Sequence, residues 1–213
     1  MEITFLGHDC FRLKGRDVTI VTDPFAPAEG SLRVSADIVT VSHDDPGHNA
    51  VSAVDGAPRA VIGPGEYEIK GVLIAGVGAF HDEQHGKARG RNTVYLIELD
   101  DLRVCHVGDL GHVLSTEQVE EIGAVDVLLV PVGGPHTVSS AQAAGIISQL
   151  EPAVVIPMDW TSRDGQSVGP LEKFTHEMGI KEYEPQTRLN VSRDSLSKDK
   201  QAGTQVVVLE PRG

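Results

Sequence analysis

Short apolar runs bounded by turn-forming residues dominate the first half of the chain. Because these runs are rich in β-branched and aromatic residues, they predict strands, which cover residues 3–7, 10–13, 18–25, 37–42 and several stretches within 59–80. Over residues 66–70, charged residues alternate with Tyr67 and Ile69, which predicts a strand with one face in water. The pair Asp100–Asp101 separates two further apolar runs, 92–99 and 102–108, and this arrangement predicts a hairpin.

Helical signals appear only in the second half of the chain. A capping box made by Ser115 and Gln118 predicts one helix start, Ser139 or Ser140 predicts another, and Pro170 at N1 with Gly179 brackets a third helix. The apolar positions at helical spacing that these helices are expected to bury are Val119, Ile122, Ala143, Ile146, Ile147, Leu150, Leu171, Phe174 and Met178. Apolar runs at 125–134, 152–158, 188–191 and 204–210 predict the remaining strands.

This order of elements predicts one α/β domain over residues 1–213. Strands come first, strand and helix then alternate, and strands close the chain, with no repeat and no long linker between them. A doubly wound sheet would show helices from the beginning. The expected architecture is therefore a pair of sheets packed face to face, with helices on the outside.

Composition narrows the class of protein and its partners. Of 213 residues, 40% are hydrophobic, and 31 acidic residues against 18 basic ones give a net charge of −13, which disfavours binding to nucleic acid or to an anionic membrane. Neither a stretch long enough to span a bilayer nor a basic leader is visible, so a cytoplasmic protein is expected. Cys10 and Cys105 lie in apolar strands and are predicted to be buried thiols. The sequence leaves open whether the chain forms a homo-oligomer.

The basic cluster of the chain is the segment HGKARGR at residues 85–91. Its glycines are typical of a turn in water. The alternative is a loop that contacts an anionic group of a small-molecule substrate, and the sequence does not decide between the two.

Potential metal ligands follow the predicted strands at several places. Strands end in His43, His81, Asp109 and Asp159, and a fifth runs out at His136. The first of these ends continues as H-x-D-x-x-H, with Asp45 and His48 as its other members. Because strand ends in a layered α/β domain gather along one edge, we expect these side chains to meet. A mixture of imidazoles and carboxylates suits zinc, manganese or iron.

The segments FLGHDCFRL, VTDPF, ADIVTVSHDDPGHN, VGDLGH, DVLLVPVGG and VVIPMDW resemble, in that order, the metal-dependent hydrolases of the metallo-β-lactamase fold. The similar branch is one of small proteins related to the ascorbate-6-phosphate lactonases. The resemblance covers nearly the whole chain and implies a four-layer αββα sandwich with a metal site at one edge between the sheets. The family's H-x-H-x-D-H motif is matched here by His43, Asp45, Gly47 and His48, so two of its four positions differ.

Carried over by residue, the resemblance implies a first ion held by His43, Asp45 and His81. A second ion would keep His48 and Asp159, with Asp109 between the two ions. Gly47 supplies no ligand and Asp159 replaces a family histidine, so one ion, or two of unequal affinity, is expected.

Further polar residues are predicted to act in catalysis, to hydrogen-bond to the metal ligands or to have structural roles. Asp45, Asp109 and His136 are the candidate catalytic groups, and Asp44 is a candidate proton acceptor. His8 and Asp23 resemble scaffold positions that hydrogen-bond to ligands, Glu66 is a candidate for contact with ligands or substrate, and structural roles are expected for His106 and His112.

The leading hypothesis is a hydrolase that uses a metal-activated hydroxide on an acyl or phosphoryl ester. A non-catalytic relative that serves as a binding or assembly protein is the principal alternative, since three of six expected ligand positions differ. A di-iron redox protein of the same fold is a third reading, disfavoured because the sequence contains no flavin domain.

Overall fold

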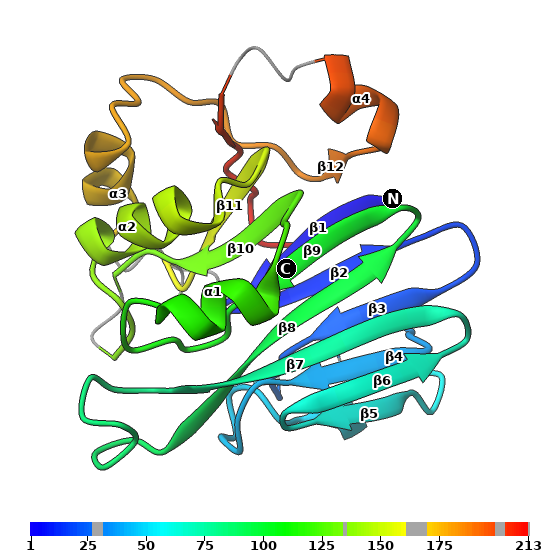
Figure 1. Cartoon of the computed structure of the whole chain (residues 1–213). Coiled ribbons are helices and arrows are strands. Elements are labelled where there is room, and N and C mark those ends of the chain that lie inside the picture. The colour runs from blue at the N-terminus through cyan, green and yellow to red at the C-terminus, as the bar shows by residue number, and fades with distance from the viewer. Residues whose placement is uncertain (27–31, 134–135, 161–169, 199–202, 213) are drawn as a thin grey trace.

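The computed structural model describes residues 1–26, 32–133, 136–160, 170–198 and 203–212 (Figure 1). Six strands form the first sheet, in the order β12-β1-β2-β3-β4-β5. They are β1 Glu2–Gly7, β2 Cys10–Lys14, β3 Thr19–Thr22, β4 Ile38–Val41, β5 Arg59–Ile62 and β12 Leu189–Asn190. The pairs β3–β4 and β4–β5 are parallel and the others antiparallel, so this sheet is mixed.

Seven strands form the second sheet, in the order β13-β11-β10-β9-β8-β7-β6. They are β6 Gly65–Ile69, β7 Val72–Phe80, β8 Arg91–Leu99, β9 Leu102–His106, β10 Val127–Pro131, β11 Val154–Met158 and β13 Gln205–Val206. Strands β9, β10, β11 and β13 run parallel, whereas β6 to β9 form an antiparallel meander. The tail of the chain thus contributes one strand to each sheet.

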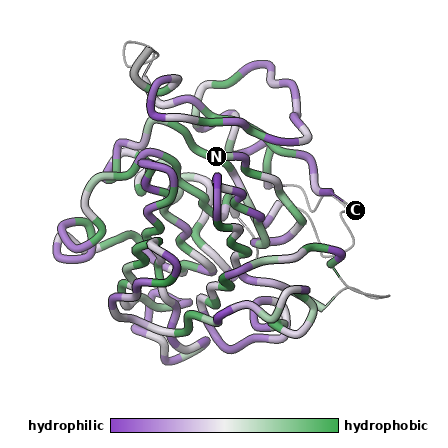
Figure 2. The backbone as a smooth tube through the Cα atoms, turned by 90° about the vertical axis from the view of Figure 1, so that its right-hand side faces the viewer, coloured by the Kyte–Doolittle hydropathy of each residue, from purple (hydrophilic) through white to green (hydrophobic). Residues whose placement is uncertain are grey.

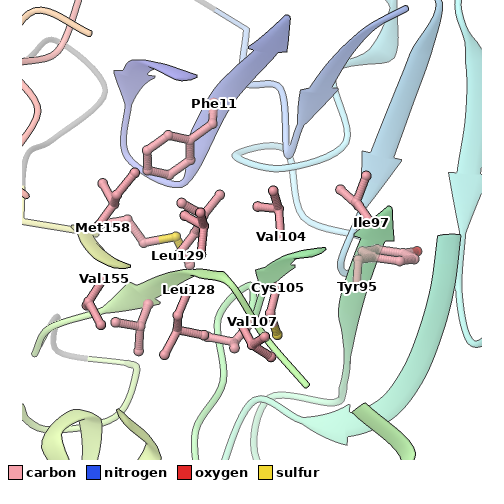
Figure 3. Packing of buried hydrophobic residues seen from close by; sticks show 14 of the residues in the cluster. Phe11, Tyr95, Ile97, Val104, Cys105, Val107, Leu128, Leu129, Val155 and Met158 are labelled. Carbon is pink, nitrogen blue, oxygen red and sulfur yellow. The ribbon is translucent and has the colours of Figure 1, made fainter. Parts of the chain in front are cut away.

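The two sheets pack face to face around a continuous apolar core. Figure 3 shows Phe11 of β2 above Leu129 and Met158 of the second sheet, and all three are fully buried. Hydrophobic residues follow the strands through the interior, and hydrophilic residues gather in the outlying turns (Figure 2). Burying these apolar side chains contributes roughly 25 cal/mol per Å² and is the main source of stability.

Helices cover the outer face of the second sheet, whereas a 3₁₀-helix and loops cover that of the first. Helices α1 (Thr116–Ile122) and α2 (Ser140–Leu150) lie on the second sheet, and α3 (Leu171–Glu177) packs on α2 (Figure 1). The outer face of the first sheet contacts a smaller apolar cluster from the 3₁₀-helix η1 (Val51–Ala53) and neighbouring loops, which includes Phe25, Val34 and Val54. This arrangement is the expected layered sandwich, with a thin fourth layer.

The local signals in the sequence are confirmed at most elements. Both capping boxes form, with Gln118 N bonded to Ser115 Oγ at 3.2 Å and Gln142 N to Ser139 Oγ at 3.3 Å. Pro170 is the N-cap of α3, one position before the expected N1. Helix α4 (Arg193–Lys198) was not predicted, because its six residues are too few to show periodicity.

Three further expectations have clear outcomes. Asp100 and Asp101 both adopt left-handed backbone conformations in the β8–β9 turn, which confirms the predicted hairpin. Cys10 and Cys105 are free and buried. Within the described residues, helices are all too short or too polar to cross a membrane.

Candidate metal centre

The carboxyl ends of six strands meet at one edge between the two sheets. His43, Asp23 and His8 follow β4, β3 and β1 of the first sheet, and His81, Asp109 and Asp159 follow β7, β9 and β11 of the second. Within each sheet these strands run in the same direction, so their carboxyl ends lie on one side. The strand ends that carry His43, His81, Asp109 and Asp159 therefore lie at one edge, and β1 and β3 end at the same edge.

His43, His81 and Asp109 form the first cluster of ligand atoms. One ligand atom from each lies within 4.8 Å of the others. Asp109 Oδ2 is 3.2 Å from His81 Nε2 and 3.7 Å from His43 Nε2. Two atoms bonded to one ion at ~2.1 Å are about 3.4 Å apart in tetrahedral geometry, so these spacings fit a shared cation.

The polar atoms of this cluster are sheltered and incompletely bonded. Among the described residues, neither His81 Nε2 nor Asp109 Oδ1 has a hydrogen-bond partner, although both atoms are buried. A buried polar atom without a partner costs about 1–3 kcal/mol, which a bound cation would offset. The side chains of His43 and His81 are 9% and 12% exposed, so both imidazoles are largely but not completely buried.

Two glycines let Asp109 approach the other ligands. A Cβ at Gly111 would lie 2.3 Å from the carbonyl carbon of His81 and 2.4 Å from Asp82 N. A Cβ at Gly108 would lie 2.5 Å from Ser42 Cβ. The GDLG sequence thus packs the Asp109 turn directly on the Ser42 side chain, next to His43, and on the backbone of His81 and Asp82.

Asp23 orients His43 through Ser42, as its expected scaffold role requires. Asp23 Oδ1 accepts a bond of 2.7 Å from Ser42 N, and the Ser42 hydroxyl donates to Asp23 Oδ2. Ser42 Oγ is 3.0 Å from His43 Nδ1. Holding Nδ1 in this way directs Nε2 of His43 towards Asp109, the arrangement by which proteins fix metal-binding imidazoles.

His8, Asp9 and His48 form the second cluster of ligand atoms that lie within 4.8 Å of one another. Asp159 lies beside this cluster, next to His8. Asp9 Oδ2 lies 2.8 Å from His8 Nδ1 and 3.0 Å from His48 Nε2. His8 Nδ1 is 3.4 Å from Asp159 Oδ1, and His48 Nε2 is 3.4 Å from Asp109 Oδ1. The two oxygens of Asp109 thus face different clusters.

Comparison with known proteins agrees with this geometry. The profile of the beta-lactamase superfamily domain matches residues 2–159. A solved structure from Thermotoga maritima, assigned to the Zn-dependent hydrolases of the metallo-β-lactamase superfamily, is 38% identical, with a TM-score of 0.75 and 98% coverage of both chains. The chain belongs to the metallo-β-lactamase superfamily.

Curated relatives place the chain among the UPF0173 proteins of this superfamily. A UPF0173 metal-dependent hydrolase of Methanoculleus marisnigri is 30% identical over 183 residues, which are 75% of this chain and 81% of the relative. Another, from Methanospirillum hungatei, is 29% identical over 187 residues, covering 77% and 84%. The predicted resemblance to metal-dependent hydrolases of this fold is confirmed.

The two clusters differ in membership from the ligand sets that the superfamily motif implied. Asp45 does not join the groups of described ligand atoms within 4.8 Å of one another: its side chain is 47% exposed, and its Oδ1 accepts from Gly47 N at 2.7 Å. Asp45 Oδ1 lies 3.7 Å from His48 Nδ1, beside the centre. The ligand assignment of Asp45 stays a prediction.

The remaining predicted residues lie around the centre or away from it. His136 is exposed, and its carbonyl accepts a bond of 3.1 Å from Arg89 Nη1. Asp44 is also exposed and accepts from Asn49 Nδ2. Glu66 is exposed on β6, where it lies opposite Ala75 of β7. His106 and His112 hydrogen-bond to backbone groups, in line with structural roles.

Asp9 is the member of the centre that sequence reasoning missed. It directly follows His8 at the end of β1, so the rule that linked strand ends to ligands could have found it. Its side chain is fully buried, and His106 Nε2 lies 2.9 Å from its backbone carbonyl. His8, Asp23 and Asp159 all have positive φ angles, a strained conformation that is common in functional sites.

The two clusters differ in proton affinity. Burial and the charge of neighbouring imidazoles lower the pKa of His43 and of His81, which favours the neutral, metal-binding form. Burial opposes protonation of His48 too, but its interactions with the carboxylates of Asp109 and Asp9 raise its pKa to about 11. Against the same burial effect, Asp9 and Asp159 raise the pKa of His8 to about 10. In the metal-free chain, protons on His8 and His48 therefore balance the carboxylates.

The basic loop borders the first cluster. Asp82 accepts bonds of 2.8–3.0 Å from the backbone amides of Gln84, Gly86, Ala88 and Arg89. These bonds order the loop directly after His81, and Arg89 is close enough to lower the pKa of His81 by its charge. The cationic side chain of Arg89 therefore lies near His81.

Proposed function

We propose that this chain is a metal-dependent hydrolase of small anionic esters, acyl or phosphoryl. The observation that carries the proposal is the convergence of His43, His81 and Asp109 within 4.8 Å, where the two imidazoles keep 9% and 12% exposure. Zinc, manganese and iron all fit this nitrogen and oxygen donor set. When bound, such an ion lowers the pKa of a water ligand and polarises the bond that is attacked.

The chain's own residues orient the reactants and transfer protons. Ser42 and Asp23 hold His43 in its ligating orientation. Asp45, half-exposed at the rim, is the proposed acceptor of the proton from water, and His136 the proposed donor to the leaving group. Arg89, bonded to the His136 carbonyl, is the proposed contact for the anionic part of the substrate.

Metal dependence is tested on chelator-treated protein reloaded with zinc, manganese or iron. We expect hydrolysis of p-nitrophenyl acetate or bis-p-nitrophenyl phosphate only after reloading, and loss of both one ion and activity in His81→Ala. His176→Ala, on the exposed surface of α3, is the control and should match the wild type. A wild-type chain that binds no metal after reloading would favour the non-catalytic alternative.

The role of Asp45 is tested separately from metal binding. If Asp45 accepts a proton, Asp45→Asn should keep its full metal content and lose ~10²–10⁴-fold in kcat, with the acidic limb of the pH profile removed. Loss of an ion in Asp45→Asn would instead make it a ligand, as the superfamily motif implied.

The preference for an anionic substrate is tested with Arg89→Ala. Hydrogen bonds to charged groups contribute about 1.5–3 kcal/mol, so KM for an anionic ester should rise about 10-fold or more, with KM for a neutral ester unchanged. The control is Arg59→Ala, since Arg59 is exposed on β5. Equal effects on both esters would contradict a role in anion binding.

A further inference from the structure

Strand β8 changes its hydrogen-bonding partner at the edge that carries the metal centre. Its antiparallel pairing with β9 ends at Tyr95 and His106, and the same register would place Thr93 opposite Gly108. The backbone amide of Thr93 instead donates to the carbonyl of Ser42, directly after β4 of the first sheet, at 2.9 Å. In the described structure, the segment that follows β9 thus leaves the β8–β9 ladder.

The side chain of Asn92 holds this segment where the ladder has ended. Asn92 lies in β8, is 1% exposed and donates from Nδ2 to the carbonyl of Val107 at 2.8 Å. The amide of Val107 donates to the carbonyl of Leu129 in β10 at 3.2 Å, so Val107 is held from two sides. Val107 stands two positions before Asp109. The bond from Asn92 therefore fixes the start of the turn that presents this candidate ligand.

Asn92 also determines how closely the Asp109 turn approaches the first sheet. Gly108 has a left-handed φ of 56°, and a Cβ there would lie 2.5 Å from Asn92 Oδ1 and 2.5 Å from Ser42 Cβ. Gly108 thus fits between these two side chains. Its neighbours in the chain include Asp109, and Ser42 directly precedes His43. The packing of Asn92, Gly108 and Ser42 therefore sets the separation of the two backbones that carry these candidate ligands.

The amide of Asn92 combines one bonded group with one unpaired group. Among the described residues, Asn92 Oδ1 has no hydrogen-bond partner although it is buried. An apolar side chain would avoid the cost of this unpaired oxygen but would leave the Val107 carbonyl without its donor. The two effects on stability oppose each other, whereas the effect of the amide on the position of Val107 has no such counterpart.

We propose that Asn92 is a positioning residue of the metal centre, which sets the separation between His43 and Asp109 through Val107 and Gly108. It acts on the backbone that carries the ligands and supplies no ligand itself. The separation that it holds is 3.7 Å between His43 Nε2 and Asp109 Oδ2. The expected effect on metal affinity rests on the proposed function, whereas the effect on this separation does not require a metal.

Asn92→Ala tests the role in two ways. Crystal structures of the metal-free wild type and variant should show a longer distance between His43 Nε2 and Asp109 Oδ2 in the variant. Competition with a chromophoric chelator should show a zinc affinity about 10–100-fold weaker, the usual loss when a residue that orients a ligand is removed. Asn92→Val is the second variant, in case Asn92→Ala does not fold. It should show both changes, since valine suits a strand but donates no side-chain hydrogen bond.

Thr175→Val is the matched control for a loss that is only structural. Thr175 is buried as well, and its hydroxyl donates to the carbonyl of Glu172 in α3 at 3.1 Å. This variant should unfold at a lower denaturant concentration and bind zinc with the affinity of the wild type. A weaker zinc affinity in Thr175→Val would show that any loss of stability weakens the site, and would remove the support from the affinity of the Asn92 variants.

The outcomes separate this role from the proposed function. An unchanged distance between His43 Nε2 and Asp109 Oδ2, or an unchanged zinc affinity where the wild type binds zinc, would refute the role of Asn92 and leave the hydrolase proposal intact. A wild type that binds no zinc, manganese or iron would refute the hydrolase proposal. The distance in the metal-free crystal structures would still decide the role of Asn92.

Discussion

At the scale of single residues, the centre depends on side chains that orient the ligands. Ser42 is buried between Asp23 and His43 and hydrogen-bonds to both. The Ser42 hydroxyl donates to the buried Asp23 carboxylate and lies within hydrogen-bond distance of His43 Nδ1, so Asp23 fixes the orientation of the His43 ring through Ser42. The ligand is thus fixed by two residues that do not touch the proposed ion.

Ser42→Ala is expected to weaken metal binding while the fold is kept. Removing a partner of this kind typically costs about 10–100-fold in metal affinity, because the ligand then samples other orientations. Competition with a chromophoric chelator measures the change. Ser148→Ala, on an exposed position of α2, is the control. Unchanged affinity in Ser42→Ala would show that packing alone holds His43.

Glycine is required at Gly111 but unfavourable at Gly145, and replacing each with alanine should change the free energy of unfolding in opposite directions. In Gly111→Ala the new Cβ would overlap the backbone of His81 and Asp82, and overpacking of this kind costs ~1–3 kcal/mol. Gly145 lies within α2, where a Cβ meets nothing within 4 Å, so Gly145→Ala should stabilise the chain by about 1 kcal/mol. Denaturant unfolding measures both variants. Equal changes would contradict this account.

At the scale of elements, the loop that carries the basic residues is ordered by one carboxylate. Asp82 binds four backbone amides. Burial alone would raise the pKa of Asp82, but these donated bonds favour the charged form and lower the pKa below 3.8. The ordering is therefore complete above pH ~4 and is lost as the pH falls through the depressed pKa.

Asp82→Asn is expected to loosen this loop selectively. The amide side chain offers one acceptor oxygen where the carboxylate offers two, so some of the four amides lose their bonds. Amide exchange followed by NMR should accelerate at Gln84, Gly86, Ala88 and Arg89, with exchange in the β8 strand unchanged. Glu121→Gln, exposed on α1, serves as the control. Faster exchange throughout the variant would mean that Asp82 supports the whole fold.

At the scale of the whole molecule, Tyr95 links the two sheets. It lies in β8 of the second sheet, and its hydroxyl contacts the carbonyls of Val41 and Val61 in the first sheet at 2.9 Å and 3.2 Å. It also accepts from Gly63 N at 2.9 Å. The ring is fully buried, so these polar groups have no access to water.

Tyr95→Phe is expected to destabilise the chain by about 1–3 kcal/mol, since buried backbone groups lose their partner. Burial raises the pKa of Tyr95 well above 10.0, so its contribution is present below pH ~10 and is lost as the pH rises further. The difference in unfolding free energy between wild type and variant should therefore shrink above pH ~10. The half-exposed Tyr183→Phe should change little. A constant difference across this range would contradict the assignment.

The sequence by itself determined the strands, the capped helices and the candidate ligands at strand ends. These features are local, because alternation, capping boxes and the side chains that follow a strand are read within a few residues. His43, His81 and Asp109 could be assigned to one edge since each follows the carboxyl end of a strand. The short helix α4 could not be predicted from the sequence, because a turn and a half of helix is too short to show a periodic apolar pattern.

Only the tertiary structure decided which candidate ligands lie close together. His48 and Asp9 are 39 positions apart, and no spacing rule connects a β1–β2 turn to the loop after β4. The pairing of strands within the two sheets determines the distances between strand ends. The packing of the buried side chains then determines which carboxylate lies next to each imidazole. Asp45, close to His43 in sequence, consequently lies at the rim, whereas Asp9 lies inside.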